Sequence, residues 1–350
     1  MTQDAALRHA LQQLSLGISL SAEETAAAFG VVMRGEATPV QTAGLLMGLR
    51  AKGETAAELA GAAYALRCAM VRLDAEGAEP LVDTCGTGGG GVGTINISTA
   101  AAFVVAGAGV PVAKHGNRSY TSRSGSADVL EALGVDITVE PGRAAQVLRQ
   151  ARLVFLFAQS YHPAMRHVGP VRRELGVATI MNLLGPLANP AGVRRQVIGV
   201  SSPDRAPLVA DALARLGTAH ALVLHAAVGM DEVSPSGATR VWEVNESAVK
   251  EWTLRPGRHG LACDDLGALA GGSPAENAVR LERVLEGGGH DAERCAVLLN
   301  AAAALYVSGN GWSFGEAVGR ARDALESGAG ARVLAALREA APARPLSTSG

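Results

Sequence analysis

From about residue 78 onward, short apolar runs alternate with helical segments, and this alternation limits the possible folds more than any other feature. Strands separated by helices need crossover connections, so an α/β fold with a mostly parallel central sheet is predicted. A late strand pair is expected around Trp242–Val244, and the chain should be helical again from about Asn277. The expected strands are 81–84, 110–113, 153–158, 197–200 and 221–225, and the expected helices lie near 96–108, 126–133 and 205–216.

The first part of the chain reads instead as a run of helices. Ser21 with Glu24, Thr38 with Gln41 and Thr55 with Glu58 each have the spacing of a capping box. A chain of 350 residues suggests about two domains at roughly 150 residues each. We therefore expect a smaller all-α domain before the α/β domain. Its many small residues would allow close helix packing, within the chain or against a second copy.

Composition excludes several classes of protein. The formal net charge of −2 gives no general attraction to nucleic acid, and aromatic residues make up only 3% of the chain. The four cysteines show neither CxxC pairing nor zinc spacing, which fits a reducing compartment. The longest apolar stretch, Ile97–Ala113, is interrupted and too short to span a bilayer. We expect a cytoplasmic protein with no nucleic-acid or membrane partner.

A glycine-rich segment, Asp83–Thr94, leaves one expected strand and enters a helix. Glycines expose consecutive backbone N–H groups and tolerate the positive φ angles of an anion-binding nest. The helix that begins near Asn96 adds its positive end, and Thr94, Asn96, Ser98 and Thr99 add short polar side chains. This pattern indicates a phosphate-binding loop, with a flexible linker as the alternative.

A second polar segment, Lys114–Asp128, follows the next expected strand. It gathers three cations and many hydroxyl groups in a chain whose net charge is negative. A small polyanion would explain this cluster, whereas a solvated surface loop is the alternative.

Two further features indicate a functional role only in combination with these loops. Asp231 and Glu232 follow an apolar run, and Mg²⁺ prefers one or two carboxylates together with water and substrate phosphate. A plain turn is the alternative. Arg172 and Arg173 lie on a helical stretch before the segment Asn182–Pro190. An arginine there could clamp a carboxylate, or belong to a solvated helix face.

Several motifs together resemble the anthranilate phosphoribosyltransferase family. They are GEATPVQTAGLLMGLRAKGET at 35–55, GTGG at 86–89, NIST at 96–99, KHGNRS at 114–119, SGSADVLEALG at 124–134, NLLGPLANP at 182–190 and GMDEVSP at 229–235. The likeness runs from about residue 15 to about residue 340. GTGG and Lys-His alone would not separate this family from pyrimidine nucleoside phosphorylases.

The resemblance implies a fold and a reaction. The architecture would be that of nucleoside phosphorylases and phosphoribosyltransferases. A helical domain of residues 1–75 with about 166–188 would form homodimers, and residues 76–165 with 189–350 would form the α/β domain. The active site would lie between the two domains. The reaction would join anthranilate to 5-phosphoribosyl 1-diphosphate (PRPP), with Mg²⁺ and release of diphosphate, in tryptophan biosynthesis.

The resemblance also implies residue roles. PRPP would be bound by Gly86, Gly89, Gly90, Thr94, Asn96, Ile97, Ser98, Thr99, Lys114, His115, Gly116, Asn117, Arg118, Ser119, Ser122 and Ser126. Anthranilate would contact Gly86, His115, Asn117, His162, Arg172 and Pro186. Ser98, Asp231 and Glu232 would hold Mg²⁺.

The chemistry of such a transfer agrees with these residue types. Loss of diphosphate from an anomeric carbon requires fixed cations and N–H donors near the leaving group, so Lys114 is expected to stabilise charge. An aryl amine is neutral at pH 7, so no acid or base is assigned. The alternatives are transfer to another aromatic amine or base, and a PRPP-binding protein without catalysis.

Three positions depart from the family pattern. Gly90 replaces the Asp of GTGGDG, which predicts an altered Mg²⁺ dependence with activity retained. Gln159 stands where Pro is usual, and Met181 where Phe is usual. Both are expected near the tunnel for the aromatic substrate.

Overall fold

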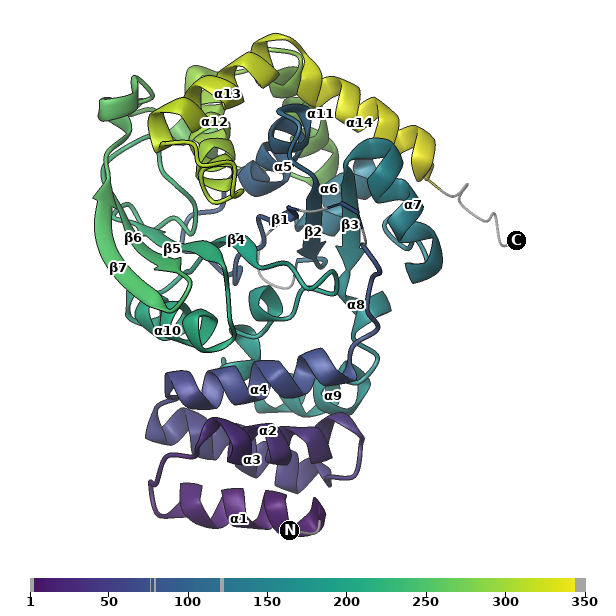
Figure 1. Ribbon diagram of the computed structural model, residues 1–350, viewed down its shortest axis with the longest axis vertical. Helices are drawn as coiled ribbons and strands as arrows, with labels where there is room; N and C mark the ends of the chain where they lie inside the picture. The colour runs from purple at the N-terminus through teal and green to yellow at the C-terminus, as the bar shows by residue number, and fades with distance from the viewer. Residues whose placement is uncertain (1–2, 76, 79, 120–122, 344–350) are drawn as a thin grey trace.

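The central element of the fold is a seven-stranded sheet (Figure 1). The computed structural model describes residues 3–75, 77–78, 80–119 and 123–343. The strand order is β3-β2-β1-β4-β5-β6-β7; the first five strands are parallel and the last two are antiparallel. The predicted α/β class with a mostly parallel sheet is therefore confirmed. The bounds are β1 (Val82–Asp83), β2 (Val112–Gly116), β3 (Leu153–Phe157), β4 (Arg195–Gly199), β5 (His220–Ala226), β6 (Thr239–Asn245) and β7 (Ala248–Leu254).

A helical bundle precedes the sheet, as predicted. It consists of α1 (Gln3–Ser15), α2 (Ala22–Met33), α3 (Pro39–Lys52) and α4 (Ala56–Ala69). All three predicted capping boxes form, at Ser21, Thr38 and Thr55. The helices approach closely, because a Cβ atom on Gly61 would lie 2.2 Å from the carbonyl oxygen of Ala22.

A later segment returns to this bundle. Helix α9 (Met165–Leu175) packs on α2 and α3, and it is reached from β3 through the short helix α8 (Ala158–Tyr161). Two 3₁₀ turns, η1 (Ile180–Asn182) and η2 (Gly185–Leu187), then lead the chain back to β4. The bundle therefore lies against the loops that surround the sheet (Figure 1).

Helices cover both faces of the sheet. Helix α10 (Ala206–Arg215) packs between the sheet and α4, so the apolar core of the bundle continues into that face. The other side carries α5 (Ile97–Gly107), α6 (Ser126–Ala132), α7 (Pro141–Ala151), α11 (Pro274–Leu285), α12 (Asp291–Tyr306), α13 (Phe314–Glu326) and α14 (Ala329–Ala340).

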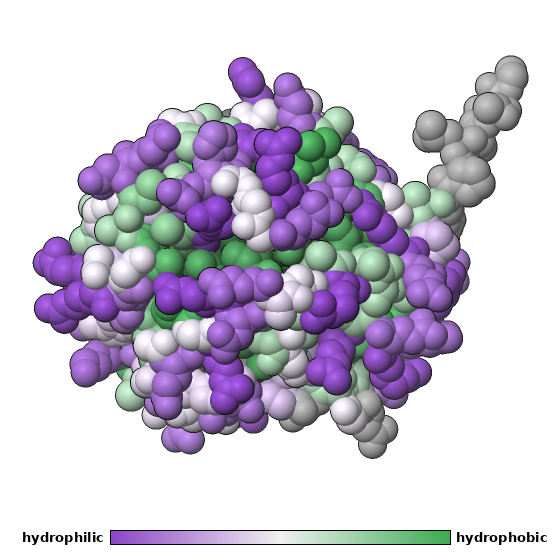
Figure 2. Space-filling view, turned by 90° about the horizontal axis from the view of Figure 1, so that it is seen from above, coloured by the Kyte–Doolittle hydropathy of each residue, from purple (hydrophilic) through white to green (hydrophobic). Residues whose placement is uncertain are grey.

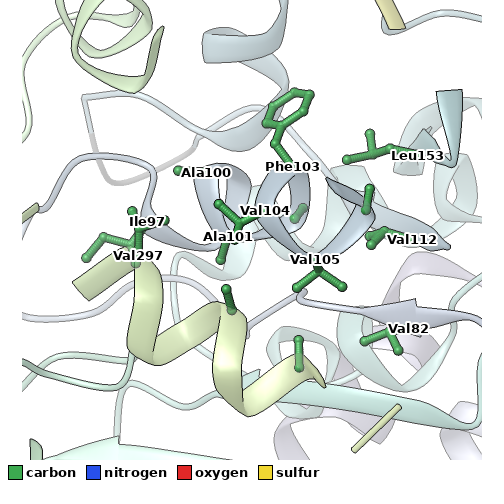
Figure 3. Packing of buried hydrophobic residues seen from close by; sticks show 14 of the residues in the cluster. Val82, Ile97, Ala100, Ala101, Phe103, Val104, Val105, Val112, Leu153 and Val297 are labelled. Atoms are coloured by element: carbon green, nitrogen blue, oxygen red, sulfur yellow. The ribbon is translucent and has the colours of Figure 1, made fainter. Parts of the chain in front are cut away.

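Helix α5 is the centre of the second apolar core. Phe103, Val104 and Val105 are fully buried and lie beside residues of β1, β2 and α12 (Figure 3). Small residues permit this packing, since a Cβ atom on Gly107 would lie 2.8 Å from the backbone nitrogen of Gly330. The core thus fixes the position of α5, including the start of this helix, which the sequence predicts to bind phosphate.

The end of the molecule that carries α11–α14 has a mainly hydrophilic surface. Figure 2 shows polar side chains around this end, with apolar atoms visible in the hollows between them. Among the described residues, no helix combines the length and the apolar character that a membrane span requires.

The antiparallel edge of the sheet is held by a carboxylate with three side-chain partners. Glu243 on β6 accepts hydrogen bonds from Trp252 Nε1 and the Tyr306 hydroxyl, both at 2.8 Å, and lies 2.7 Å from His220 Nε2. The bond to His220, followed by the bonds to Tyr306 and Trp252, holds the pKa of Glu243 below its usual value against the effect of burial.

Replacing this carboxylate should destabilise the protein. Glu243→Gln would leave part of the network unpaired, and we expect a loss of about 1–3 kcal/mol of unfolding free energy at pH 7, measured by denaturant titration. Folding lowers the pKa of Glu243. The difference in unfolding free energy between wild type and variant should therefore be fully present above the pKa of the unfolded state. It should disappear as the pH falls through the pKa of the folded state. The exposed Glu251→Gln, which breaks only a pair with Arg240, should change stability by less than about 1 kcal/mol. Equal losses of stability in the two variants would show that the hydrogen bonds of Glu243 contribute no more than an exposed ion pair.

Candidate active site

The strand order brings four loops together at one edge of the sheet. Strands β2, β1, β4 and β5 are parallel neighbours, so their carboxyl ends lie side by side. Ligands of open α/β sheets bind at this edge. The glycine-rich segment follows β1, the basic segment follows β2, and Asp231 and Glu232 come after β5. Three separate sequence motifs therefore meet in space.

The glycine-rich loop has the backbone of an anion nest. Gly88 and Gly89 take positive φ angles of 69° and 77°. The start of the loop is fixed on β4 by a hydrogen bond of 2.9 Å from Thr87 N to the Gly199 carbonyl oxygen. A Cβ atom on Gly86 would lie 2.9 Å from that same oxygen. The start of the loop is thus anchored on β4, and Gly88 and Gly89 beyond it are exposed.

The start of α5 lies beside the carboxylate pair, because the Ser98 amide in its first turn donates to Glu232. Asn96, at the N-cap, makes no side-chain capping bond. Its side chain instead bonds with Ser124 and Asn277, at distances between 3.0 and 3.3 Å. The first N–H groups of an uncapped helix favour an anion. Asn96 would then contribute to a ligand site through its backbone.

The other predicted ligand-binding residues of this stretch differ in their surroundings. Thr94 forms an isolated bridge with Ala270, which secures the end of the loop. The Ile97 side chain is buried in the core. The Thr99 hydroxyl is buried and has no hydrogen-bond partner among the described residues. Ser98, in contrast, directs its hydroxyl toward Lys114 of the basic segment.

Lys114 joins the first two motifs. Its side chain is buried, and Nζ donates to the carbonyl and hydroxyl oxygens of Thr84, both at 3.0 Å, and to Ser98 Oγ at 3.3 Å. The ammonium group therefore lies between the glycine-rich loop and the start of α5. A cation in this place would face a bound diphosphate.

Asp231 and Glu232 complete this cluster. The amide of Ser98 donates to Glu232 Oε1 at 3.2 Å. Burial, and then repulsion from Asp231, raises the pKa of Glu232 to about 8, and burial raises the pKa of Asp231. Two half-buried carboxylates that repel each other fit a divalent cation. No group of three or more His, Cys, Asp or Glu side chains in the described ranges is arranged to hold a metal.

Gly90 touches this carboxylate pair. A Cβ atom on Gly90 would lie 2.4 Å from Asp231 Oδ1 and 2.9 Å from its Cγ. The space that a side chain at position 90 would occupy is therefore filled by Asp231. The glycine that replaces the Asp of GTGGDG therefore lies directly against a predicted metal ligand.

The basic segment after β2 is folded back onto α6. Gly116 packs closely enough on Ser126 that an added Cβ atom would lie 2.3 Å from its hydroxyl oxygen. Asp128 accepts hydrogen bonds from the amides of Ser119 and Gly125 at 3.0 and 2.8 Å. The Asn117 side chain accepts from the Arg118 amide at 2.8 Å.

Arg118 directs its charge toward α6. Its guanidinium pairs with Glu131 and lies 3.4 Å from Asp128. Its predicted contact with PRPP would require that these ion pairs be exchanged. Ser122, also predicted to bind PRPP, lies outside the described residues.

A pair of neutral histidines lies beside the phosphate cluster. His115 Nδ1 lies 3.0 Å from the Gly185 carbonyl oxygen, and His115 Nε2 lies 3.1 Å from His162 Nε2. A carbonyl only accepts, so His115 must donate from Nδ1 and accept at Nε2 from His162. Burial lowers the pKa of His115 to about 3 and that of His162 to about 4. Both rings are therefore uncharged at neutral pH.

The remaining predicted acceptor residues come from the bundle side. Pro186 is buried in η2, next to Gly185. Arg172 lies on α9, which packs on α3. Of the two departures expected near the tunnel, Met181 is buried in the core of the bundle, whereas Gln159 on α8 is exposed.

Sequence reasoning missed several residues that hold this site. Asp83 and Asn189 are buried and hydrogen-bonded to each other, although 106 positions separate them. His225, at the end of β5, bonds to the Val200 carbonyl oxygen through Nδ1 at 2.8 Å and lowers the pKa of Asp231 slightly against burial. A polar residue inside an apolar strand was the available signal for Asp83.

A cavity of about 600 Å³ lies away from this site. Its lining includes Arg72, Pro141 and Arg149. A neighbouring cavity shares Arg149 and is bordered by Pro111 and Arg152, which precede β2 and β3. These cavities lie at the amino ends of the strands, opposite the clustered motifs.

Comparison with known proteins gives consistent matches along the chain. The family described as "Glycosyl transferase family, a/b domain" matches residues 78–331, and "Glycosyl transferase family, helical bundle domain" matches residues 8–70. Anthranilate phosphoribosyltransferase of Thermomicrobium roseum is 50% identical over 322 residues, which cover 91% of this chain and 92% of that protein.

Solved structures agree with these matches. Anthranilate phosphoribosyltransferase of Thermus thermophilus has a TM-score of 0.88 at 45% identity, covering 94% of this chain and 99% of that one. The Saccharomyces cerevisiae enzyme, in complex with PRPP and Mg, has a TM-score of 0.87 at 30% identity, covering 96% and 98%.

The contact between Gly90 and Asp231 predicts the effect of restoring the family residue. Gly90→Asp should displace Asp231 and place a third carboxylate beside the predicted metal, so the Mg²⁺ concentration that supports half-maximal turnover should change several-fold. Gly93→Asp adds the same charge to the same loop where an added Cβ meets no atom within 4 Å, and should change it less. An unchanged Mg²⁺ profile in Gly90→Asp would refute the prediction.

Proposed function

The chain belongs to the anthranilate phosphoribosyltransferase family, and from this premise we propose that the clustered loops are its active site. The protein transfers the phosphoribosyl group of PRPP to the amine of anthranilate and releases diphosphate, a step of tryptophan biosynthesis. The observation that best supports this site is the cluster of Lys114, Ser98 and Glu232. It brings a buried cation, a helix start and a carboxylate pair to one end of the sheet.

The donor half of the site would bind the diphosphate. The amide groups at Gly86, Gly88 and Gly89 would donate hydrogen bonds to its oxygens, and the positive end of α5 would add a favourable field. Negative charge grows on the diphosphate as its bond to the ribose breaks. Lys114 is held in position before the reaction, so its charge would stabilise the transition state without reorganisation.

The carboxylate pair would hold Mg²⁺ together with Ser98. When bound, Mg²⁺ would neutralise negative charge on the diphosphate and help to orient it. Asp231 lies against Gly90 and Glu232 accepts from the Ser98 amide, so both carboxylates have fixed neighbours in the residues that would hold the metal.

The acceptor half would lie beside the histidine pair. An aromatic amine attacks as the neutral species, so a strong base is not required. Neutral imidazoles provide a polar surface next to an aromatic ring without adding charge. Asn117 and Arg172 would orient the carboxylate of anthranilate, with Gly86 and Pro186 bordering the ring.

We also propose the division of the chain into two units. Residues 1–75 with about 166–188 would form the helical domain, and residues 76–165 with 189–350 the α/β domain. The packing of α9 on α2 and α3 supports this division. Exposed apolar residues on the bundle, among them Leu16, Val40 and Tyr64, support a homodimer interface there. A cytoplasmic location would suit the free cysteines of the described chain.

The transfer reaction is tested by following the fluorescence of anthranilate. With PRPP and Mg²⁺ present, the signal of the free amine should be consumed by the purified protein. Folded protein that consumes no anthranilate would refute the proposed function. Binding of PRPP without turnover would instead support a non-catalytic PRPP-binding protein, and consumption of only another aromatic amine would identify a different acceptor.

Removing the negative charge of the carboxylate pair should abolish the response to Mg²⁺. The double variant Asp231→Asn, Glu232→Gln should reduce Mg²⁺-dependent turnover at least about a hundredfold, since both proposed carboxylate ligands are lost. Asp204→Asn, which removes an exposed carboxylate just after β4, serves as the control. A wild-type Mg²⁺ response in the double variant would show that Asp231 and Glu232 form a turn that does not bind the metal.

A further inference from the structure

Asp83 is a buried carboxylate whose two oxygens serve two different parts of the site. It ends β1 and is fully buried. Oδ1 accepts from the backbone amide of His115 on β2 at 3.2 Å, and Oδ2 accepts from Asn189 Nδ2 at 2.7 Å. One side chain therefore connects the strand that carries Lys114 and His115 with the segment that leads into β4.

Asn189 has little freedom to move. Its Nδ2 also donates to the Ala113 carbonyl oxygen at 2.8 Å, and its Oδ1 accepts from the Ala191 amide at 2.8 Å. The side chain is 4% exposed. The end of the segment is thus fixed to β1 and β2 through a single amide group.

The residues just before Asn189 face the acceptor half of the site. Their carbonyl oxygens bond to three different elements: Gly185 to His115 on β2, Pro186 to Gln196 on β4, and Leu187 to Arg67 on α4. The position of Gly185 sets the orientation of the His115 ring, which in turn bonds to His162. Any shift of segment 185–189 would therefore reach the histidine pair.

The charge of Asp83 matters for this arrangement. Burial raises its pKa to about 6, while Lys114 and the bonds from Asn189 and His115 oppose that rise. At neutral pH the group is ionised and accepts on both oxygens. An asparagine of the same shape has only one acceptor oxygen, so one of the two donors would be left unpaired in a buried place.

We propose that Asp83 is a positioning residue that holds segment 185–189 and the His115 ring in register, so that it sets the affinity for the aromatic acceptor more than the affinity for PRPP. This inference rests on the proposed function of the site. Asp83 acts through Asn189 and His115 and does not itself touch a substrate. Its effect on the donor half is smaller because Lys114 keeps its own bonds to Thr84 and Ser98.

The test compares the two substrates in Asp83→Asn. The KM for anthranilate should rise about tenfold or more, whereas the dissociation constant of PRPP with Mg²⁺, measured by calorimetry, should change less than about threefold. Asn189→Ala removes the same link from its other end and should give the same selective change. The effect of the double variant should be smaller than the sum of the two single effects, because both changes break the Asp83–Asn189 bond in addition to bonds of their own.

A matched control separates positioning from stability. Glu58 is a fully buried carboxylate of the bundle that bonds to Lys52 and to backbone amides. Glu58→Gln should lower the melting temperature while leaving the ratio of the two substrate constants unchanged. If Asp83→Asn does not fold, Asn189→Ala carries the test alone.

The outcomes distinguish this inference from the proposed function. Parallel loss of affinity for anthranilate and PRPP, or additive effects in the double variant, would overturn the positioning role. A wild-type protein that does not consume anthranilate would overturn the proposed function instead.

Discussion

The buried ammonium group of Lys114 is the interaction on which the rest of the site depends. A charge in a low-dielectric interior is costly unless it is paired and hydrogen-bonded, and Lys114 satisfies both conditions through its bonds to Thr84 and Ser98 and through the nearby Glu232 carboxylate. Those partners come from the end of β1, the start of α5 and the loop after β5. Because one cation bonds to or lies near all of them, the three motifs are held in one arrangement before any ligand binds.

Close backbone approach is the second constraint, and glycine makes it possible. A Cβ atom on Gly199 would lie 1.6 Å from the carbonyl oxygen of Asp231, and one on Gly90 would overlap the Asp231 side chain. The segment that carries the carboxylate pair can therefore lie directly on β4 and on the glycine-rich loop. Glycines in this chain are thus used to place charged groups within reach of one another, as well as to make turns.

Much of the fold could be predicted from local pattern, because alternating strands and helices and capping boxes depend on neighbouring residues. The bounds of the elements were predicted less accurately: a strand was expected at 81–84, whereas β1 has only two residues, Val82 and Asp83. Long-range partners could not be predicted. Nothing near Arg118 in sequence indicates that Glu131 takes its charge, and the Asp83–Asn189 bond spans 106 positions. Such contacts follow from strand order, which a single sequence does not specify.

The arrangement of the loops implies that the donor substrate binds where β1, β2, β4 and β5 end. A crystal structure of the protein with PRPP and Mg²⁺ tests it most directly. We expect diphosphate along the glycine-rich loop and the start of α5, within reach of Lys114, with the metal on Asp231 and Glu232. PRPP bound instead in the arginine-lined cavities at the amino ends of the strands would contradict it.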